Sequence, residues 1–338
     1  MAQSVAAWES RIETVIRQCR PYNNVSEIPR KMPKEFFDPI DAEELAGWIR
    51  KGFREHPPGM NPKRDLLFTA MDMAAIASDK DKYAPLVALW SETTWDVCRQ
   101  LRKPAEPGRL ILYKLYNEGA VIRAHGLCIG IDIVLPSRDD RAGPGLAEFL
   151  DALFISHSDR DHYDPQSSLV TGLERAGKPV IVAKDDETVA VGGVLKSGKV
   201  AGLEWTSFRG GHLNGRFSSF YHFKIGDWSI LHSGDNTAWL APESPLVRNA
   251  DIFFLKPESV YVVDGKWQGG VQTAMEESLR KLRPRLVIPH HLLEVGHRLG
   301  AYGHDMGIRL RNQVAEGTRV QMLQWGESLS FSFQRKTM

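Results

Sequence analysis

The stretch ALFISHSDRDHYD, residues 152–164, carries the strongest signal in this chain. It begins as a short apolar run, which is typical of a buried strand, and it ends in a charged loop. Four potential metal ligands fall within six residues of this loop: His157, Asp159, Asp161 and His162. Imidazole and carboxylate groups are suitable ligands for zinc and for harder first-row metals. A polar surface turn is the alternative for this stretch alone, because Asp and His are common in turns.

Further ligand-type residues follow strand-like apolar runs elsewhere in the chain. His212 ends the segment GGH, Asp235 lies in ILHSGDN, and RLVIPHH ends in His290 and His291. Gly234 would allow a tight turn just before Asp235. Sheets of α/β proteins place their sites at strand ends, so we expect these residues to lie around one site.

The pattern of the chain changes near residue 105. The first part is rich in helical patterns and ends in KPAEPGR, residues 103–109, which we interpret as a linker. Helices are expected over 6–20, from the capping-box-like Asp41 and Glu44 onward, and over about 64–78 and 83–102.

From residue 110 onward, short strands alternate with helices, which favours an α/β sandwich over a purely parallel sheet. Two or three strands joined by turns at Asn117–Gly119 and His125–Gly126 are expected in 110–136. The other expected elements are a buried strand in KPVIVA (178–183), hairpins around Gly226–Asp227 and in 318–333, and helices over 169–177 and about 271–282.

The net charge, the cysteines and the apolar runs of the sequence indicate the class of protein and its surroundings. The 338 residues carry a net charge of +1, which gives no whole-chain reason to expect a nucleic-acid partner. The three cysteines, Cys19, Cys98 and Cys128, have no short-range pairing, which fits a reducing compartment. No signal peptide or membrane-spanning run is apparent. We therefore expect a cytoplasmic protein that acts on a small molecule, without a membrane partner.

In their order along the chain, the ligand-type residues resemble the signature of the metallo-β-lactamase superfamily. That signature is a strand-end Asp, then H-x-H-x-D-H, then a lone His, a lone Asp and a final His. The counterparts here are Asp132, the segment 157–162, His212, Asp235 and His291. Tyr163 and Asp164 look like the branch that contains L-ascorbate-6-phosphate lactonase and N-acylphosphatidylethanolamine phospholipase D.

The resemblance covers about residues 110–333 and implies a fold. It implies an α/β protein with a metallo-β-lactamase αββα sandwich as its catalytic domain, over residues 106–338. Residues 1–105 would be an N-terminal helical extension, which matches no family that we recognise. These helices are expected to roof the pocket or to form a homodimer contact.

The resemblance also implies a binuclear metal site. The first ion would be held by His157, Asp159 and His212, the second by Asp161, His162 and His291, with Asp235 bridging the two. Asp159 departs from the family, which usually has a histidine there. A carboxylate oxygen is a harder metal ligand than an imidazole nitrogen, in the sense that it favours harder metal ions. Zinc is the favoured ion, and manganese or iron are the alternatives.

A binuclear site of this kind implies a hydrolase with a metal-activated hydroxide. Asp161 could accept a proton or orient the hydroxide. The bond would be an ester, lactone, amide or phosphodiester of a small molecule. Three alternatives stay open: a nuclease or nucleotide phosphodiesterase on the same fold, a di-iron redox protein, and a binding protein without activity.

Five residues near the ligands have a functional and an ordinary interpretation. Asp132 would orient a ligand or cap a strand, and Tyr163 would contact a substrate oxyanion or pack in the core. Asp164 would hydrogen-bond a metal-bound histidine or form an Asx turn before Pro165. His290 is the alternate final ligand, and His297 lies in a glycine-rich segment that could border the pocket.

Overall fold

The computed structural model describes Ser10 and residues 42–59, 61–76, 84–212, 217–236, 250–257, 262–263, 266–267, 269–293, 304, 307, 310–311 and 314–333. The helix expected over 6–20 lies outside these residues, except for Ser10, which is helical.

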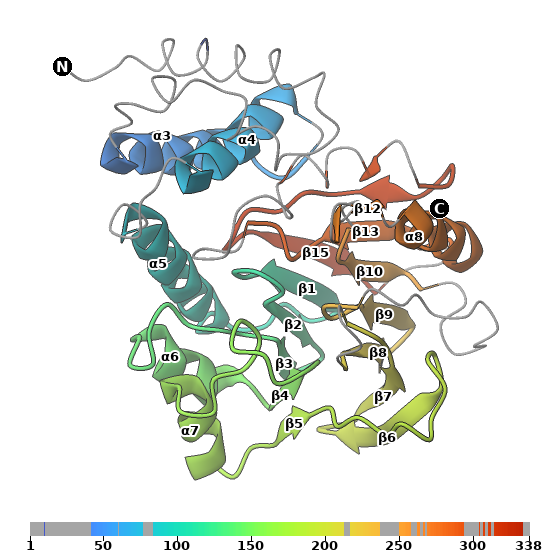
Figure 1. Cartoon of the computed structure of the whole chain (residues 1–338). Helices are drawn as coiled ribbons and strands as arrows, with labels where there is room; N and C mark the ends of the chain where they lie inside the picture. Colours follow the sequence, from blue (N-terminus) through green and yellow to red (C-terminus); the bar gives the residue numbers. More distant parts are fainter. Residues whose placement is uncertain are drawn as a thin grey trace.

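Two β-sheets lie face to face between layers of helices (Figure 1). In the described part of the chain, the first sheet has six strands in the order β15-β1-β2-β3-β4-β5, and the second has seven in the order β14-β13-β10-β9-β8-β7-β6. The first sheet comprises β1 (Arg109–Lys114), β2 (Ala120–Ala124), β3 (Leu127–Ile131), β4 (Ala152–Ile155), β5 (Val180–Val182) and β15 (Ser328–Ser332). The second comprises β6 (Val194–Val200), β7 (Leu203–Arg209), β8 (Ser219–Ile225), β9 (Trp228–His232), β10 (Ile252–Leu255), β13 (Leu286–Pro289) and β14 (Arg319–Val320). A separate small ribbon pairs β11 (Val262–Val263) with β12 (Lys266–Trp267).

Helices cover the outer faces of both sheets. The described helices are α3 (Ala42–Glu55), α4 (Pro62–Ile76), α5 (Ala84–Leu101), α6 (Ala142–Phe149), α7 (Ser168–Arg175) and α8 (Gly269–Leu282). Residues of α5, α6 and α7 share a core with the first sheet, and residues of α8 share one with the second. The predicted α/β class and αββα arrangement are therefore confirmed. None of the helices among the described residues combines the length and hydropathy needed to cross a membrane.

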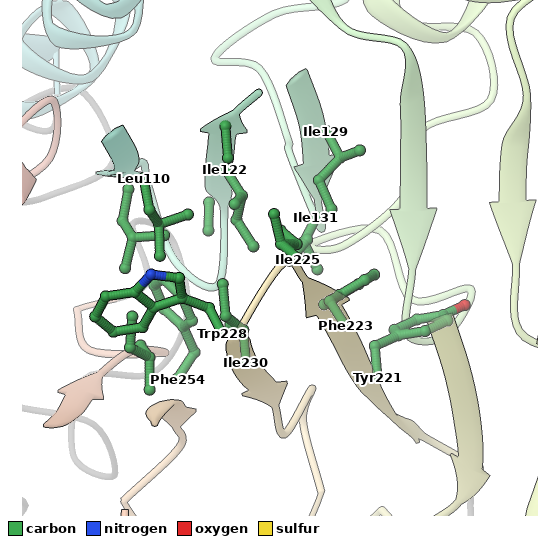
Figure 2. Packing of buried hydrophobic residues seen from close by; sticks show 14 of the residues in the cluster. Leu110, Ile122, Ile129, Ile131, Tyr221, Phe223, Ile225, Trp228, Ile230 and Phe254 are labelled. Carbon is green, nitrogen blue, oxygen red and sulfur yellow. The ribbon is translucent and has the colours of Figure 1, made fainter. Parts of the chain in front are cut away.

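Side chains alternate between the two faces of each strand, and those on the inner faces form the core. In β1, Leu110 and Leu112 point between the sheets, whereas Tyr113 points toward the helices. In β10, Ile252 and Phe254 likewise point inward. Figure 2 shows the two inner faces meeting, with Leu110, Ile122, Ile129 and Ile131 on one side and Phe223, Ile225, Trp228, Ile230 and Phe254 on the other. Each such fully buried side chain contributes about 1.5–3 kcal/mol, which fixes the sheets against each other.

The directions of the strands bring the C-terminal ends of several of them to one edge of the sandwich. β3 and β4 are parallel, and β1 runs the same way because β2 is antiparallel to both β1 and β3. In the second sheet β9, β10 and β13 are parallel, and β7 shares their direction through antiparallel β8. The segments that follow these seven strands carry most of the predicted ligands, which is the placement expected for α/β sheets.

Three expectations about elements need correction. The strand in KPVIVA is half-buried rather than buried, because β5 lies at the edge of its sheet. The prediction of a hairpin over 318–333 is wrong, because β14 pairs with β13 in one sheet and β15 pairs with β1 in the other. The sequence analysis also missed α6, whose segment AGPGLAEF contains two glycines and a proline, which are poor helix formers.

Candidate metal centre

The loop after β4 is wound tightly, so that its ligand-type side chains share one region. The backbone N–H groups of His162 and Tyr163 both donate to the carbonyl of Asp159, at 2.9 Å. Asp132, at the end of neighbouring β3, accepts a hydrogen bond from the N–H of Ser156 at 2.7 Å. This bond fixes the start of the loop, just before His157.

One group of donors surrounds the first predicted metal position. Asp159 Oδ2 lies 3.7 Å from Nε2 of His157 and 3.7 Å from Nε2 of His212. Asp235 Oδ2 lies 3.2 Å from Nε2 of the same His212. Ligand atoms of His157, His212 and Asp235 all lie within 4.8 Å of one another, a separation that one cation can span.

A second group of donors adjoins the first. Asp161 Oδ2 lies 2.9 Å from Nε2 of His162 and 3.7 Å from Nε2 of His291. Nε2 of His291 is also 3.7 Å from Asp235 Oδ2. A single oxygen of Asp235 is therefore within 4 Å of a histidine from each group.

The chemistry of the donors fits metal ions. Nε2 of His157 is buried and has no hydrogen-bond partner among the described residues. A buried polar atom without a partner is costly, and a cation at this position would supply the partner. The neighbouring donors are imidazole nitrogens and carboxylate oxygens, which are the ligand types of zinc, manganese and iron sites.

Backbone conformation at the site is unusual. Asp132 and His291 have positive φ angles of 43° and 55°, a region that residues with a side chain seldom adopt. Such conformations persist where the surrounding structure enforces them, often at functional sites. Gly234 has φ 53°, and a Cβ there would lie 2.6 Å from the carbonyl oxygen of Ser219. Glycine is thus required just before Asp235.

Three histidines of the site, His157, His212 and His291, are neutral in the metal-free protein. Burial, reinforced by neighbouring cationic groups, lowers the pKa of His157 to about 2 and that of His212 to about 4. Burial likewise lowers the pKa of His291 to about 3. At neutral pH these imidazoles keep a free lone pair, which metal coordination requires.

His162 and Asp161 behave as an ionic pair. Burial by itself would lower the pKa of His162, but the carboxylates of Glu118 and Asp161 outweigh it and raise this pKa well above its ordinary value. Burial would raise the pKa of Asp161, yet His162 and His291 hold it below its usual range. A cation at this position would take over the role of the imidazolium proton.

The structure separates His290 from His291. Nε2 of His290 lies 2.9 Å from Oγ of Ser233, and its ring packs edge-on against His232. His291 instead faces Asp161 and Asp235. This geometry favours His291 as the final ligand.

The other residues with predicted roles lie in different settings. Asp132 Oδ2 lies 3.5 Å from Nδ1 of His162, as expected for a group that orients a ligand. Tyr163 packs against the core formed by α5–α7 and the first sheet. Asp164 accepts hydrogen bonds from Arg138 Nε and from the N–H of Gln166, both at 2.9 Å, and the second bond forms an Asx turn. His297 lies outside the described residues.

The sequence analysis missed two charged groups at the centre. Glu118 is fully buried, and its Oε2 lies 3.4 Å from Nδ1 of His162. Lys256 is also fully buried, and its ammonium group contacts Oδ1 of Asp235. Lys256 directly follows the apolar run IFFL, so the strand-end argument that selected Asp235 applies to it as well. Glu118 lies inside a predicted turn, and nothing local distinguishes it from a solvent-exposed turn residue.

Comparison with known proteins gives similarity in fold. No protein-family model and no curated protein sequence matches the chain. Among solved structures, the chain is similar to the metallo-β-lactamase fold protein YhfI from Bacillus subtilis, with 12% identity and a TM-score of 0.48 over 66% of this chain and 100% of that one. It is also similar to Igni18, a metallo hydrolase from Ignicoccus hospitalis, with 16% identity and a TM-score of 0.47 over 67% and 100% of the two chains.

A third similar structure is CmlA, a di-iron β-hydroxylase from Streptomyces venezuelae. The two share 16% identity and a TM-score of 0.43, over 80% of this chain and 62% of that one. At these values the similarity concerns the arrangement of the elements, and the interpretation of the site depends on the contacts described above.

Proposed function

We propose that this chain is a hydrolase of the metallo-β-lactamase type that uses two divalent cations. One observation carries the proposal: Asp235 Oδ2 lies 3.2 Å from Nε2 of His212 and 3.7 Å from Nε2 of His291. A carboxylate oxygen that is shared between two sets of donors is what a bridging ligand between paired cations requires.

Each side chain has a role in this proposal. His157, Asp159 and His212 hold the first ion, Asp161, His162 and His291 hold the second, and Asp235 bridges them. When bound, the cations would act as Lewis acids and would lower the pKa of a water molecule toward neutrality. Zinc is the favoured occupant, and the carboxylate of Asp159 keeps manganese and iron as alternatives.

Asp161 would be the proton acceptor in the reaction. Its side chain is 26% exposed, so water and substrate can reach it, whereas His162 beside it is fully buried. Because His162 and His291 keep the pKa of Asp161 low, the carboxylate is ionised at neutral pH. It can therefore orient a water molecule and accept its proton while an ester, lactone or phosphodiester bond is attacked.

Metal content tests the first half of the proposal. The purified protein should retain about two equivalents of zinc, manganese or iron by elemental analysis, as expected for a two-metal hydrolase. Asp235→Ala should lose more metal than any other single-ligand variant, because Asp235 serves both ions. A wild-type protein that takes up no metal, even after incubation with each ion, would refute the proposal.

Substrate turnover tests the second half. We expect the metal-loaded protein to hydrolyse at least one of p-nitrophenyl acetate, a γ-lactone and bis(p-nitrophenyl) phosphate. His157→Ala should reduce the rate by more than about 100-fold, because even the outer partners of metal ligands contribute about 10–100-fold. His125→Asn is the matched control, since His125 lies in the β2–β3 turn, has φ 51° and is replaced by a residue that tolerates this conformation. Turnover of the phosphodiester alone would favour the phosphodiesterase alternative.

A further inference from the structure

The turn between β1 and β2, next to the centre, is held by several hydrogen bonds. Lys114, a buried residue at the end of β1, donates from Nζ to the carbonyls of Leu115 at 2.5 Å and of Gly119 at 3.5 Å, and also to that of Asn117. The N–H of Leu115 donates to the carbonyl of Gly119 at 2.8 Å. These bonds close residues 115–119 into a compact turn around the side-chain nitrogen of Lys114.

This turn contacts three predicted ligands of the second metal ion. The N–H of His291 donates to the carbonyl of Asn117 at 3.2 Å. The side-chain amide of Asn117 donates to the carbonyl of Asp161 at 3.3 Å. Glu118 Oε2 lies 3.4 Å from Nδ1 of His162. One short turn thus meets every ligand that the second ion does not share with the first.

Glu118 is the most costly member of the turn. Its side chain is fully buried, and neither carboxylate oxygen has a hydrogen bond among the described residues. Burying such a group is unfavourable unless a partner of opposite character offsets it. The imidazole of His162 is that partner, and Asp132 Oδ2 approaches the same Nδ1 at 3.5 Å.

Two carboxylates on Nδ1 fix the state of the imidazole. Because carboxylate oxygens of Glu118 and Asp132 lie 3.4 and 3.5 Å from Nδ1, they favour a proton on Nδ1, which leaves the lone pair of neutral His162 on Nε2. Nε2 is the atom that lies 2.9 Å from Asp161, on the side of the predicted metal. Carboxylates behind metal-binding histidines orient the ring and increase its basicity.

We propose that Glu118 is a positioning residue for the second metal ion, acting through Nδ1 of His162 from a turn that also holds Asp161 and His291. This inference rests on the proposed function, because it needs a cation at His162. The contacts of the turn described above go to Asp161, His162 and His291, and not to His157 or His212, the histidines of the first ion. Loss of Glu118 should therefore weaken the second ion selectively.

The test is a metal titration of the whole protein after chelator treatment. Zn²⁺ affinity is measured by competition with a chromophoric chelator, and the visible absorption of bound Co²⁺ reports the geometry at each position. Glu118→Ala should weaken the second Zn²⁺ by about 10–100-fold and change the absorption of the second Co²⁺. Glu118→Gln, which keeps an acceptor and loses the charge, should fall between Glu118→Ala and wild type. Glu148→Gln is the control, because Glu148 is 61% exposed on α6.

The outcomes separate this inference from the function on which it rests. A wild-type protein that binds no metal would refute the proposed function itself. A wild-type protein that binds two ions, with both Glu118 variants binding the second as tightly, would overturn only the inference. Chemical unfolding of the metal-free variants shows whether a weaker second ion comes from a damaged fold. If Glu118→Ala does not fold, Glu118→Gln decides, and unchanged Zn²⁺ affinity in that variant overturns the role.

Discussion

Asp235 faces different partners with its two carboxylate oxygens. Oδ2 is directed at His212 and His291, whereas Oδ1 contacts the ammonium group of Lys256. Lys256 is fully buried, so water cannot compensate its charge, and Asp235 is its counter-ion. The pair keeps one oxygen of Asp235 away from the metal positions and leaves the other available to bridge them.

Lys256→Met should therefore destabilise the metal-free protein. Methionine keeps much of the volume of the side chain but leaves Asp235 as a buried carboxylate without its cation, which costs about 3–5 kcal/mol in the free energy of unfolding. Chemical unfolding in the presence of a chelator measures the change. Added zinc should recover part of the loss, because cations bound only by the folded state stabilise it. The exposed Lys224 provides the control, and equal unfolding free energies for Lys256→Met and Lys224→Met would contradict this role.

Helix α4 is tied to the sandwich by a buried ion pair. Arg64 is 1% exposed and donates from Nη1 and Nη2 to the two carboxylate oxygens of Glu327, at 2.8 and 2.5 Å. Glu327 also accepts a hydrogen bond at its carbonyl from the N–H of Lys114, at 2.9 Å. Helix α4 is thereby connected to the strand end from which the Glu118 turn begins.

Glu327→Gln should lower the free energy of unfolding by about 3 kcal/mol, because it leaves a buried guanidinium without its anion. Asp96→Asn breaks the exposed pair with Arg99 and should change this free energy by less than about 1 kcal/mol. Urea unfolding of the two variants measures the difference. If Glu327→Gln proves no more harmful than Asp96→Asn, then α4 is not held to the sandwich by this pair.

The elements that the sequence predicts well are those that local pattern controls. The helices α3, α4 and α5, and the strands on either side of Gly226–Asp227, form where periodicity and turn residues place them. The last two strands show the limit: β14 and β15 are neighbours in sequence, but β14 joins the preceding strand β13 in one sheet, whereas β15 joins β1 in the other. Their separation depends on the closure of both sheets, which no local pattern encodes.

The same contrast applies to the candidate site. Ligand-type side chains could be found from residue type and position after a strand, and the structure brings His157, His162, His212, Asp235 and His291 together. Glu118 and Lys256 contact His162 and Asp235, and their importance depends on distances that only the folded chain fixes. The domain division at residue 105 stays a prediction, although α5, from the first part, packs with α6 and α7 in one core.

At the scale of the whole molecule, we expect the burial of so many imidazoles to make the protein sensitive to acid. Burial lowers the pKa of six histidines below the ordinary value of about 6.5. These are His157, His212, His222, His232, His290 and His291. Three groups act in the opposite direction: Glu118 and Asp161 raise the pKa of His162 against burial, and burial raises the pKa of Glu118 to about 7 and that of Glu327 above its ordinary value.

The metal-free protein should therefore lose stability as pH falls from about 6.5 toward 4. In this window the six histidines become protonated in the unfolded chain but stay neutral in the folded chain. The free energy of unfolding therefore decreases as the pH falls. His162, Glu118 and Glu327 bind protons more readily in the folded state and offset only part of this effect. Thermal unfolding of chelator-treated protein between pH 7.5 and 4.5 should show a falling midpoint. A midpoint that is constant or rises toward acid would mean that these imidazoles are not buried in their neutral form. The basis for a site with free lone pairs at neutral pH would then be lost.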